Sequence, residues 1–339
     1  MDTHIVERLA DFISDGNMDA EMIHTESEHS AISAAIGASA TGVRVFTATA
    51  SQGLALMHEI MFIASGLRLP IVMAVANRTL SSPINIWNDQ QDSISERDSG
   101  WIQFYAESSQ EALDLTIMAY KIAENHSILL PAMVCIDGYV LSHLYEGVNM
   151  PSQKEVDSFL PKFKPYHKLD PDKPITLGPI GFPEHFQLFK QQQQEAMLKS
   201  IDIIKKTQNE FYKIFKRKYS LIETYKVKDA NTVIVGMGTL CGTARVVVDG
   251  LRDIKKKKIG LVKITCFRPF PKNELIKSLK GKNIIVIDRN ISLGMEGALA
   301  SELKSILPNV KGIVTGLGGK DVTKEIIIKA ISAKDRSWL

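Results

Sequence analysis

Residues 25–53 read TESEHSAISAAIGASATGVRVFTATASQG, and this stretch decides the fold. The small residues from Ala31 to Gly42 predict a closely packed helix, and Val43 to Thr49 predict the buried strand that follows it. Ser51-Gln52-Gly53 marks the turn into the next helix. Glu28 stands at the start of the small-residue helix, where a charge in a close-packed α/β layer needs a structural or a chemical reason.

The structural reason would be a helix cap. Thr25-x-x-Glu28 matches the capping-box pattern, in which the side chains of Thr25 and Glu28 satisfy backbone N–H groups at the helix start. Such a cap stabilises a helix by about 0.5–2 kcal/mol. Spacing alone supports this explanation at least as well as catalysis, so both interpretations of Glu28 stay open at this point.

Composition bounds the kind of protein. The chain has 339 residues, 45% of them hydrophobic, which is enough for two α/β domains with their own cores. A net charge of +3 gives no case for nucleic acid. No apolar run reaches the roughly 18 residues that span a bilayer, and the first residues lack targeting character. We therefore expect no membrane association and a cytoplasmic location.

Cysteine usage supports that location. Cys135, Cys241 and Cys266 lie far apart, and the chain contains no CxxC pair. A structural metal or an iron–sulfur cluster held by this chain alone is therefore not expected. Cys135 and Cys266 lie in apolar strand patterns, so buried, inert thiols are predicted. An odd number of cysteines fits a reducing compartment.

Strand and helix patterns alternate along most of the chain, which predicts two doubly wound, mostly parallel α/β domains. The predicted domains are residues 1–145 and 229–339, joined by an extended linker and long helix over 146–228. The predicted strands are Glu21–His24, Val43–Thr49, Leu69–Ala76, Trp101–Ala106, Leu129–Ile136, Thr232–Val235, Ile259–Thr265, Asn283–Ile287 and Gly312–Val314.

Two glycine-containing or irregular segments invite a functional interpretation. The irregular stretch Asn77–Ser99 is long for a compact domain, and loops of this length are usually functional or disordered. Its aromatic residues and Pro83 favour an ordered, functional loop. Gly236-x-Gly238 before a helix suggests a dinucleotide site, but Gly242 is one position late for GxGxxG and no acidic residue closes the next strand. A structural turn is favoured there.

A family resemblance rests on several of these segments together. The chain resembles the alpha subunits of pyruvate:ferredoxin oxidoreductases, within the 2-oxoacid:ferredoxin oxidoreductase family, and Glu26–Ala31 is the first segment that carries this resemblance. The likeness runs from about Thr3 to the C-terminus. The other segments that carry it are Thr47–Leu54, Asn77-Arg78, Pro83–Asp89, Arg97–Trp101, Asp137-Gly138, Phe267–Pro271, Asp288–Asn290 and Gly316–Gly319.

The resemblance implies roles for four residues. The first domain would bind the pyrimidine of thiamine diphosphate and would lack its first strand, while the second would be similar to the transketolase C-terminal domain. Glu28 would be the catalytic, cofactor-activating glutamate, Arg78 the substrate-binding arginine, and Ser51 and Gln52 would line the cofactor pocket. Asn85, Asn88 and Asp89 would shape the same pocket, although loop structure explains them equally well.

The chemistry of these roles follows from the side chains. A glutamic acid bonded to the aminopyrimidine nitrogen favours the imino tautomer, which takes the proton from the thiazolium carbon. Such a carboxyl must be partly desolvated to share a proton at neutral pH. The guanidinium of Arg78 is a natural partner for the carboxylate and keto oxygen of pyruvate, and it follows a strand, where ligands bind in parallel sheets.

The resemblance also implies partners. Asp137-Gly138 lacks the remainder of the GDG…NN signature that binds Mg²⁺ and diphosphate in this enzyme class. The thiamine diphosphate would therefore be shared with a partner subunit, and Mg²⁺ and [4Fe-4S] clusters would lie on partners. We expect a hetero-oligomer with beta, gamma and delta subunits that acts on pyruvate, CoA and ferredoxin. This chain itself is expected to hold no metal.

Two alternatives stay open at this stage. The enzyme could act on another 2-oxoacid. The chain could also be a truncated, non-catalytic scaffold, because family members begin further upstream with a strand and a Tyr-Pro-Ile-Thr-Pro segment that precedes the position of Thr3. A copurifying chain with GDG…NN and CxxC-rich motifs would favour the enzyme.

Overall fold

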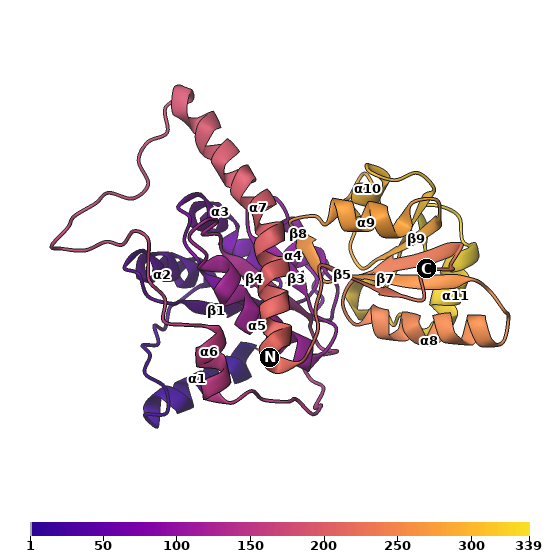
Figure 1. The fold of residues 1–339 in the computed structure, drawn as a ribbon, viewed down its shortest axis with the longest axis horizontal. Helices are drawn as coiled ribbons and strands as arrows, with labels where there is room; N and C mark the ends of the chain where they lie inside the picture. Colours follow the sequence, from indigo (N-terminus) through magenta and orange to yellow (C-terminus); the bar gives the residue numbers. More distant parts are fainter. Residues whose placement is uncertain (1) are drawn as a thin grey trace.

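The computed structural model describes residues 2–339, with side chains described from Ile5 onward. Its strands form two sheets that lie next to each other, each with helices packed on it (Figure 1). We call the first sheet with its helices the first unit, and the second sheet with its helices the second unit. Nearly all neighbouring strands are parallel, which confirms two doubly wound, mostly parallel α/β domains.

The first sheet has five strands in the order β1-β2-β4-β3-β8, and the second has six in the order β11-β10-β9-β6-β7-β5. The strands of the first sheet are β1 (Phe46–Thr49), β2 (Val72–Asn77), β3 (Ile102–Tyr105), β4 (Ala132–Asp137) and β8 (Cys266–Arg268). Those of the second are β5 (Ile222–Tyr225), β6 (Thr232–Gly236), β7 (Ile259–Ile264), β9 (Asn283–Asp288), β10 (Val310–Val314) and β11 (Ser337–Trp338).

Helices fill the connections between the strands. The helices up to the second sheet are α1 (Asp2–Ser14), α2 (Glu28–Ala40), α3 (Gln52–Gly66), α4 (Gln91–Ser95), α5 (Ser109–Ala123), α6 (Gln153–Phe159) and α7 (Pro183–Phe215). Those of the second unit are α8 (Leu240–Asp253), α9 (Lys272–Leu279), α10 (Ala298–Lys304), a short 3₁₀ turn (Leu317–Gly319) and α11 (Lys324–Ser332).

Both faces of the first sheet are buried. Met73 and Val75 of β2 pack in the core that includes α2 and α3, whereas Val72 and Val134 pack in the core that includes α5 and α7. Successive side chains of a strand point to opposite faces, so a nearly continuous apolar run supplies both cores. This packing fixes the strand ends that carry the predicted site.

The two units are joined by strand β8, which follows β7 of the second sheet in the chain but belongs to the first sheet. The chain leaves β7 in the second sheet and continues as β8, which pairs antiparallel with β3 at the edge of the first sheet. Phe267 of β8 packs edge-on against Tyr105 of β3, with ring centroids 6.2 Å apart. The predicted motif Phe267–Pro271 is therefore the crossing between the sheets.

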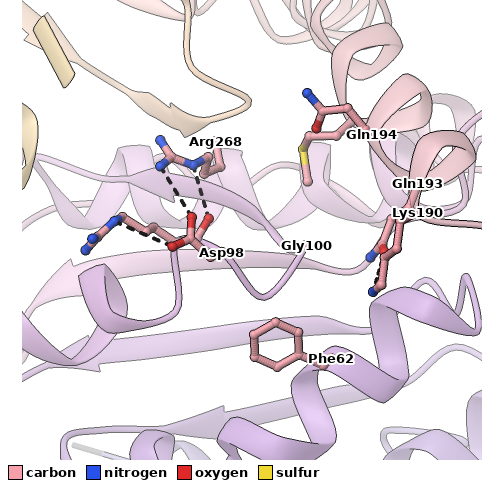
Figure 2. A pocket seen from close by; sticks show the side chains of 9 residues that line it. Phe62, Asp98, Gly100, Lys190, Gln193, Gln194 and Arg268 are labelled. Carbon is pink, nitrogen blue, oxygen red and sulfur yellow. Dashed lines mark hydrogen bonds and ion pairs between the residues drawn. The ribbon is translucent and has the colours of Figure 1, made fainter. Parts of the chain in front are cut away.

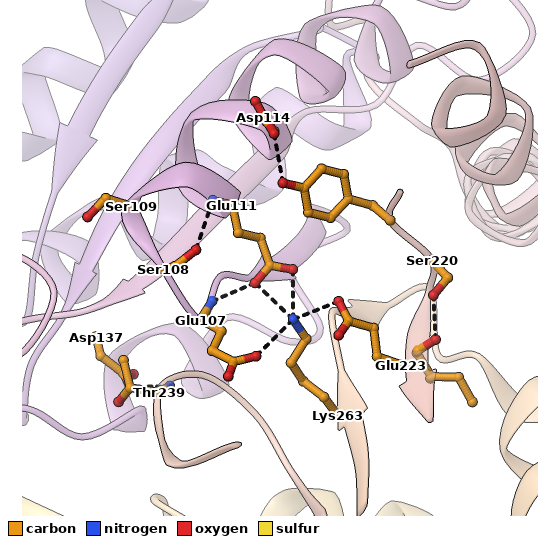
Figure 3. Close-up of polar contacts among 12 residues, drawn as sticks. Glu107, Ser108, Ser109, Glu111, Asp114, Asp137, Ser220, Glu223, Thr239 and Lys263 are labelled. Carbon is orange, nitrogen blue, oxygen red and sulfur yellow. Dashed lines mark hydrogen bonds and ion pairs between the residues drawn. The ribbon is translucent and has the colours of Figure 1, made fainter. Parts of the chain in front are cut away.

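A buried lysine also links the units. Lys263 of β7 lies 2.8 Å from a carboxylate oxygen of Glu223, 3.0 Å from Glu111 and 3.1 Å from Glu107 (Figure 3). Glu107 and Glu111 belong to the first unit, and Glu223 to β5 of the second. Burial alone would lower the pKa of Lys263, but the carboxylates of Glu111, Glu223 and Glu107 outweigh it and raise that pKa.

Three details differ from the sequence-based predictions. Glu21–His24 is not a strand, because these residues pair with no strand of either sheet. They are irregular and mostly exposed. The predicted extended linker contains a helix, α6. The sequence pattern predicts that the long helix starts at Gln191, but α7 already begins at Pro183. The first turns of α7 are exposed and project beyond the other helices of the first unit (Figure 1).

Candidate functional site

The parallel strands β1, β2 and β4 end at one edge of the first sheet. Thr49 of β1 pairs with Val75 of β2, and Asn77 at the end of β2 pairs with Asp137 at the end of β4. Ligands in parallel α/β sheets bind outside these carboxyl ends. Ser51, Gln52 and Arg78 directly follow β1 and β2, so the structure brings these predicted residues to one edge.

A carboxylate that the sequence analysis missed, Asp92, holds this edge together. Its Oδ2 accepts hydrogen bonds from the backbone N–H groups of Ser51 and Arg78, each at 2.9 Å. Its Oδ1 accepts from the Asn77 amide and from the backbone N–H of Ser93, each at 2.7 Å. Burial raises the pKa of Asp92 to about 7, although all four donors favour the ionised form.

Ser51 is held in an unusual conformation by these contacts. It is buried and has φ 53° and ψ −124°, a region that non-glycine residues rarely occupy. Its hydroxyl donates to the carbonyl of Thr79, so the side chain is bonded within the protein. Gln52, the first residue of α3, is exposed, and its Oε1 accepts from the backbone N–H of Ser81 at 3.2 Å. Strain of this kind often accompanies functional sites.

The cap of helix α2 is Ser27, so the predicted cap by Thr25 is wrong. Ser27 has an extended backbone, and its hydroxyl accepts from the backbone N–H of Ser30 at 3.3 Å. Thr25 instead donates to the carbonyl of Ser27 at 3.1 Å. The helix begins directly after Ser27, which leaves Thr25 outside it. Glu28 is therefore the first helical residue, and a Thr25–Glu28 capping box does not form.

Glu28 faces the start of α3. A Cβ built on Gly53 would lie 2.8 Å from Oε1 of Glu28 and 2.7 Å from Oγ1 of Thr49, so only glycine leaves room for both. Thr49 Oγ1 is buried and lacks a hydrogen-bond partner in the described structure. Glu28 is exposed, and its carboxylate makes neither a hydrogen bond nor an ion pair with any described residue. The partial desolvation expected of it is therefore not provided by this chain alone.

Arg78 lies at the end of β2 with an unpaired guanidinium. Its backbone is fixed by Asp92, and its side chain is half-buried. Nε of Arg78 is buried without a hydrogen-bond acceptor, and the guanidinium has no carboxylate partner among the side chains described from Ile5 onward. A Cβ on Gly138 would overlap the carbonyl of Asn77 and lie 3.0 Å from Cγ of Arg78, so Gly138 leaves the space that Arg78 occupies.

Asp137 is used within the protein. Its Oδ2 accepts from the backbone N–H of Thr239 at 2.8 Å and from Nη1 of Arg289 at 2.9 Å, both in the second unit. Gly238 has φ +69°, and a Cβ there would lie 2.9 Å from the Asp137 carboxylate. The turn Gly236–Gly238 thus binds a carboxylate of this chain at the beginning of α8. This agrees with the structural interpretation of that turn and fills the position that a phosphate would take.

Asn85, Asn88 and Asp89 contact the second unit. Asn85 Nδ2 donates to the carbonyl of Gly318 at 3.1 Å, and the Gly318 N–H donates to Asp89 at 3.2 Å. The carbonyl of Asn88 accepts from the N–H of Gly319 at 2.7 Å. Of the two explanations that the sequence allowed for these residues, their contacts favour loop structure.

Two surface depressions lie near the junction of the units. One of about 590 Å³ is lined by Trp87, Asn88, Tyr139, Val140, His143, Leu144, Gly319 and Asp321, and it adjoins the strand ends. The other, of about 280 Å³, lies between α3, α7 and β8 (Figure 2). Of its three cations, Arg97, Lys190 and Arg268, the last is paired with Glu302, and none of the predicted site residues lines this depression. Glu28, Ser51, Gln52 and Arg78 do not line the first depression either, which is formed by the loops that follow β2 and β4 and by the turn after β10.

Three further features bear on metal binding, membrane insertion and thiol chemistry. Among the side chains of residues 5–339, no group of three or more His, Cys, Asp or Glu could hold a metal ion. In that part of the chain, no helix combines the length and the apolar character needed to cross a membrane. All three cysteines are free thiols and are buried, which confirms the prediction made for Cys135 and Cys266.

Two family models match the chain. Residues 2–209 match the family described as pyruvate flavodoxin/ferredoxin oxidoreductase, thiamine diphosphate-binding. Residues 230–327 match the family described as pyruvate:ferredoxin oxidoreductase core domain II. Together the two matches include the strand ends and the turns of the second unit described above.

Curated relatives are similar over nearly the whole chain. Pyruvate synthase subunit PorA of Methanocaldococcus jannaschii is 54% identical over 348 residues, covering 99% of this chain and 89% of that protein. Ketoisovalerate oxidoreductase subunit VorA of Pyrococcus horikoshii is 47% identical over 330 residues, covering 95% of this chain and 83% of that protein. The members of this group thus include proteins named for different 2-oxoacids.

A solved structure shares the fold. The 2-oxoglutarate:ferredoxin oxidoreductase from Magnetococcus marinus matches 97% of this chain with a TM-score of 0.71 at 17% identity, and this chain spans 59% of that one. Two family matches and relatives at 47–54% identity settle the relationship that the strand-end residues suggest. The chain belongs to the pyruvate:ferredoxin oxidoreductase family.

Proposed function

We propose that this chain is a subunit of a thiamine-diphosphate-dependent, CoA-acetylating pyruvate:ferredoxin oxidoreductase. The enzyme would convert pyruvate, CoA and oxidised ferredoxin into acetyl-CoA, carbon dioxide and reduced ferredoxin, or run in reverse. The similarity to pyruvate synthase subunits PorA supports this reaction. The observation that carries the proposal is the Glu28 carboxylate, which lies beside Gly53 without a partner among the described residues.

The residues around Glu28 fit the pyrimidine half of thiamine diphosphate. Gly53 leaves a cradle that a Cβ would fill, and Thr49 Oγ1 is a buried polar atom without a partner. Buried polar groups in native proteins nearly always have a partner, so a ligand with a polar edge would satisfy this one. The residues that would hold the cofactor are Glu28, Ser51 and Gln52, with Ser51 contributing its fixed backbone, since its hydroxyl is bonded to Thr79.

Each site residue has a distinct task in this proposal. When bound, thiamine diphosphate supplies the nucleophilic carbon that attacks the carbonyl of a 2-oxoacid. Glu28 exchanges a proton with the ring nitrogen of the aminopyrimidine, and its unpaired carboxylate leaves it free to do so. Arg78 binds the carboxylate of the substrate, because its guanidinium faces no other anion in the described chain. Asp92 fixes the backbone of Ser51 and Arg78 so that both keep their places.

A partner chain would complete this site. Glu28 is exposed here, and the same region carries exposed apolar side chains on the loops that follow β2 and β4, among them Ile84 (87% exposed), Trp87 (46%) and Tyr139 (57%). Exposed apolar groups of this kind mark contact surfaces. We propose that a partner subunit covers them and brings the Mg²⁺ and the diphosphate-binding residues.

The wider assembly follows the family. We propose that beta, gamma and delta subunits carry the Mg²⁺ site, the [4Fe-4S] clusters and the contacts to CoA and ferredoxin, in a complex located in the cytoplasm. Three buried free thiols fit a reducing compartment. We also propose that residues 1–145 and 229–339 act as the two domains, with 146–228 as their connection; residue 1 lies outside the described residues.

The alternative substrate is another 2-oxoacid, which can be compared directly with pyruvate. The similarity to a ketoisovalerate oxidoreductase subunit at 47% identity favours a branched-chain 2-oxoacid as the alternative. The test is to co-express this chain with the beta, gamma and delta subunits of the same source, purify the complex, and measure CoA-dependent ferredoxin reduction. Faster turnover with pyruvate than with 2-oxoisovalerate or 2-oxoglutarate is expected. Preference for another acid would reassign the substrate, and a complex inactive with all three would contradict the proposal.

A further inference from the structure

The second unit forms hydrogen bonds with the loop Asn77–Ser99, which follows β2 and contains the site residue Arg78. Gly318 and Gly319, in the turn after β10, donate their N–H groups to the Asp89 carboxylate at 3.2 Å and to the Asn88 carbonyl at 2.7 Å. Asn85 Nδ2 returns a hydrogen bond to the carbonyl of Gly318 at 3.1 Å. Asp89 is only 2% exposed, so this contact is buried.

A second segment of the same unit holds the next part of the loop. The carbonyl of Arg289 accepts from the backbone N–H of Gln90 at 2.8 Å, and the N–H of Ile291 donates to Oε1 of Gln91. The side chain of Arg289 also reaches Asp137 at the end of β4. The loop is therefore bonded to the second unit on both sides of Asp89.

The glycines of this turn are needed for its shape and for its close approach. Gly318 and Gly319 have φ +63° and φ +81°, where other residues are strained. A Cβ on Gly318 would lie 2.8 Å from Asn85 Nδ2, the end of a flexible side chain. A Cβ on Gly319 would overlap the Cβ of Trp87, which cannot move unless the loop backbone moves.

Asp92 connects this loop to the site. It directly follows Gln91, and its carboxylate accepts hydrogen bonds from the backbone N–H groups of Ser51 and Arg78. We propose that the Gly318-Gly319 turn of the second unit is a positioning device for the substrate-binding loop, acting through Asp89 and Asp92 on Arg78. The second unit then has a role in substrate binding as well as in assembly. This inference rests on the proposed function, because its readout is the oxidation of pyruvate.

The test compares three glycine-to-alanine variants in the assembled complex. Gly281 is the matched control: it has φ +79°, it lies between α9 and β9, and its Cβ would meet nothing within 4 Å. Gly281→Ala should have the strain of a positive φ without touching the loop. Gly318→Ala should raise KM for pyruvate moderately, and Gly319→Ala should lower kcat/KM by about 10- to 100-fold, as expected when a binding group is displaced.

The readouts separate positioning from folding. Gly281→Ala and Gly318→Ala should have similar thermal midpoints, Gly319→Ala a lower one because of its overlap with Trp87, and in all three the apparent affinity for thiamine diphosphate should change less than KM for pyruvate. If Gly319→Ala matches Gly281→Ala in KM and kcat, the inference is overturned. If Gly319→Ala does not fold, Asn85→Asp removes the Nδ2 donor to Gly318 and keeps the Oδ1 that accepts from Thr79 and from the Trp87 N–H, and an unchanged KM for pyruvate there overturns the inference equally.

Failure of the proposed function would look different. A wild-type complex that does not oxidise pyruvate but oxidises another 2-oxoacid contradicts the substrate assignment and leaves the positioning test intact with that acid. A wild-type complex that oxidises pyruvate, with variants that all behave alike, contradicts the positioning role alone.

Discussion

Asp92 and Arg78 are bonded through the backbone: Oδ2 of Asp92 accepts the N–H of Arg78 at 2.9 Å, and the same oxygen accepts the N–H of Ser51 at 2.9 Å. One buried carboxylate thus fixes the turn after β1 relative to the end of β2. The cofactor-side turn and the substrate-side arginine of the proposed site share this single anchor.

Replacing Asp92 with asparagine should weaken both the fold and the site. Every neighbour of the carboxylate is a donor, so the NH₂ group of an asparagine would face N–H groups in either orientation. The free energy of unfolding should fall by about 1–3 kcal/mol in urea denaturation. KM for pyruvate in the assembled enzyme should rise. Asp98→Asn is the control, since Asp98 is 76% exposed; equal effects of the two variants would contradict the anchor.

Arg78→Ala should weaken substrate binding more than cofactor binding. The guanidinium has no anionic partner in the described chain, so its removal leaves no protein carboxylate unpaired. Loss of a charged hydrogen bond to substrate predicts a rise in KM for pyruvate of about 10- to 100-fold. Steady-state kinetics and a titration with thiamine diphosphate would check this. An unchanged KM, or an equal loss of cofactor affinity, would contradict the assigned role.

Lys263→Met should destabilise the junction of the two units. Lys263 is 3% exposed and contacts Glu107, Glu111 and Glu223. The variant leaves the buried carboxylate of Glu111 without its cation, whereas Glu107 and Glu223 keep their ion pairs with Arg245. Such a loss costs about 3–5 kcal/mol of unfolding free energy. Lys226→Met, which removes a surface pair with Asp249, is the control and should stay close to wild type in urea denaturation. Similar midpoints for both variants would show that the buried cluster adds nothing.

Asp288 should make stability depend on pH. It is the buried last residue of β9, and its carboxylate accepts from the N–H groups of Leu299 and Ala300 in α10. Burial raises its pKa from 3.8 to about 7. The folded state therefore holds a proton that the unfolded chain releases above pH 4, so this contribution to stability decreases as pH rises from about 4 to 7 and is level above that. The difference in unfolding free energy between wild type and Asp288→Asn should follow this course. A difference that is constant from pH 4.5 to 8 would contradict it.

The sequence predicted the local elements well where periodicity was strong. Leu69–Ala76 and Leu129–Ile136 are nearly continuous apolar runs, and they became β2 and β4. Glu21–His24 failed as a strand, because strand formation needs a neighbour to pair with, which periodicity does not report. The strand β8 was missed for the same reason: Cys266–Arg268 is short and is defined by its pairing with β3.

The site could be predicted in part. Ser51, Gln52 and Arg78 follow predicted strands, and the structure brings these strand ends to one sheet edge. The role of Glu28 came from the family resemblance alone and stays a prediction, although the structure places its carboxylate beside Gly53. Asp92 was missed, because in sequence it is one polar residue among many in a long loop, and only the fold shows four donors converging on it.

The identity of the capping residue and the hydrogen bonds between the second unit and the loop could not be predicted from the sequence. Ser27 and Thr25 both suit a helix cap by residue type, and the choice of Ser27 follows from where the backbone becomes helical. The contacts of Gly318 and Gly319 join segments that are distant in the sequence, and no local sequence pattern predicts such contacts.

Glu28→Gln in the assembled complex tests the central claim most directly. Glutamine keeps the size of the side chain but cannot exchange a proton, and Glu59→Gln is the matched control on a neighbouring helix, where Glu59 is 80% exposed. Both variants should assemble and bind ferredoxin. The account predicts that Glu28→Gln lowers kcat for pyruvate oxidation by at least about 100-fold while Glu59→Gln stays at the wild-type rate. Turnover of Glu28→Gln at the wild-type rate would contradict the role of Glu28 as the proton partner of the thiamine ring.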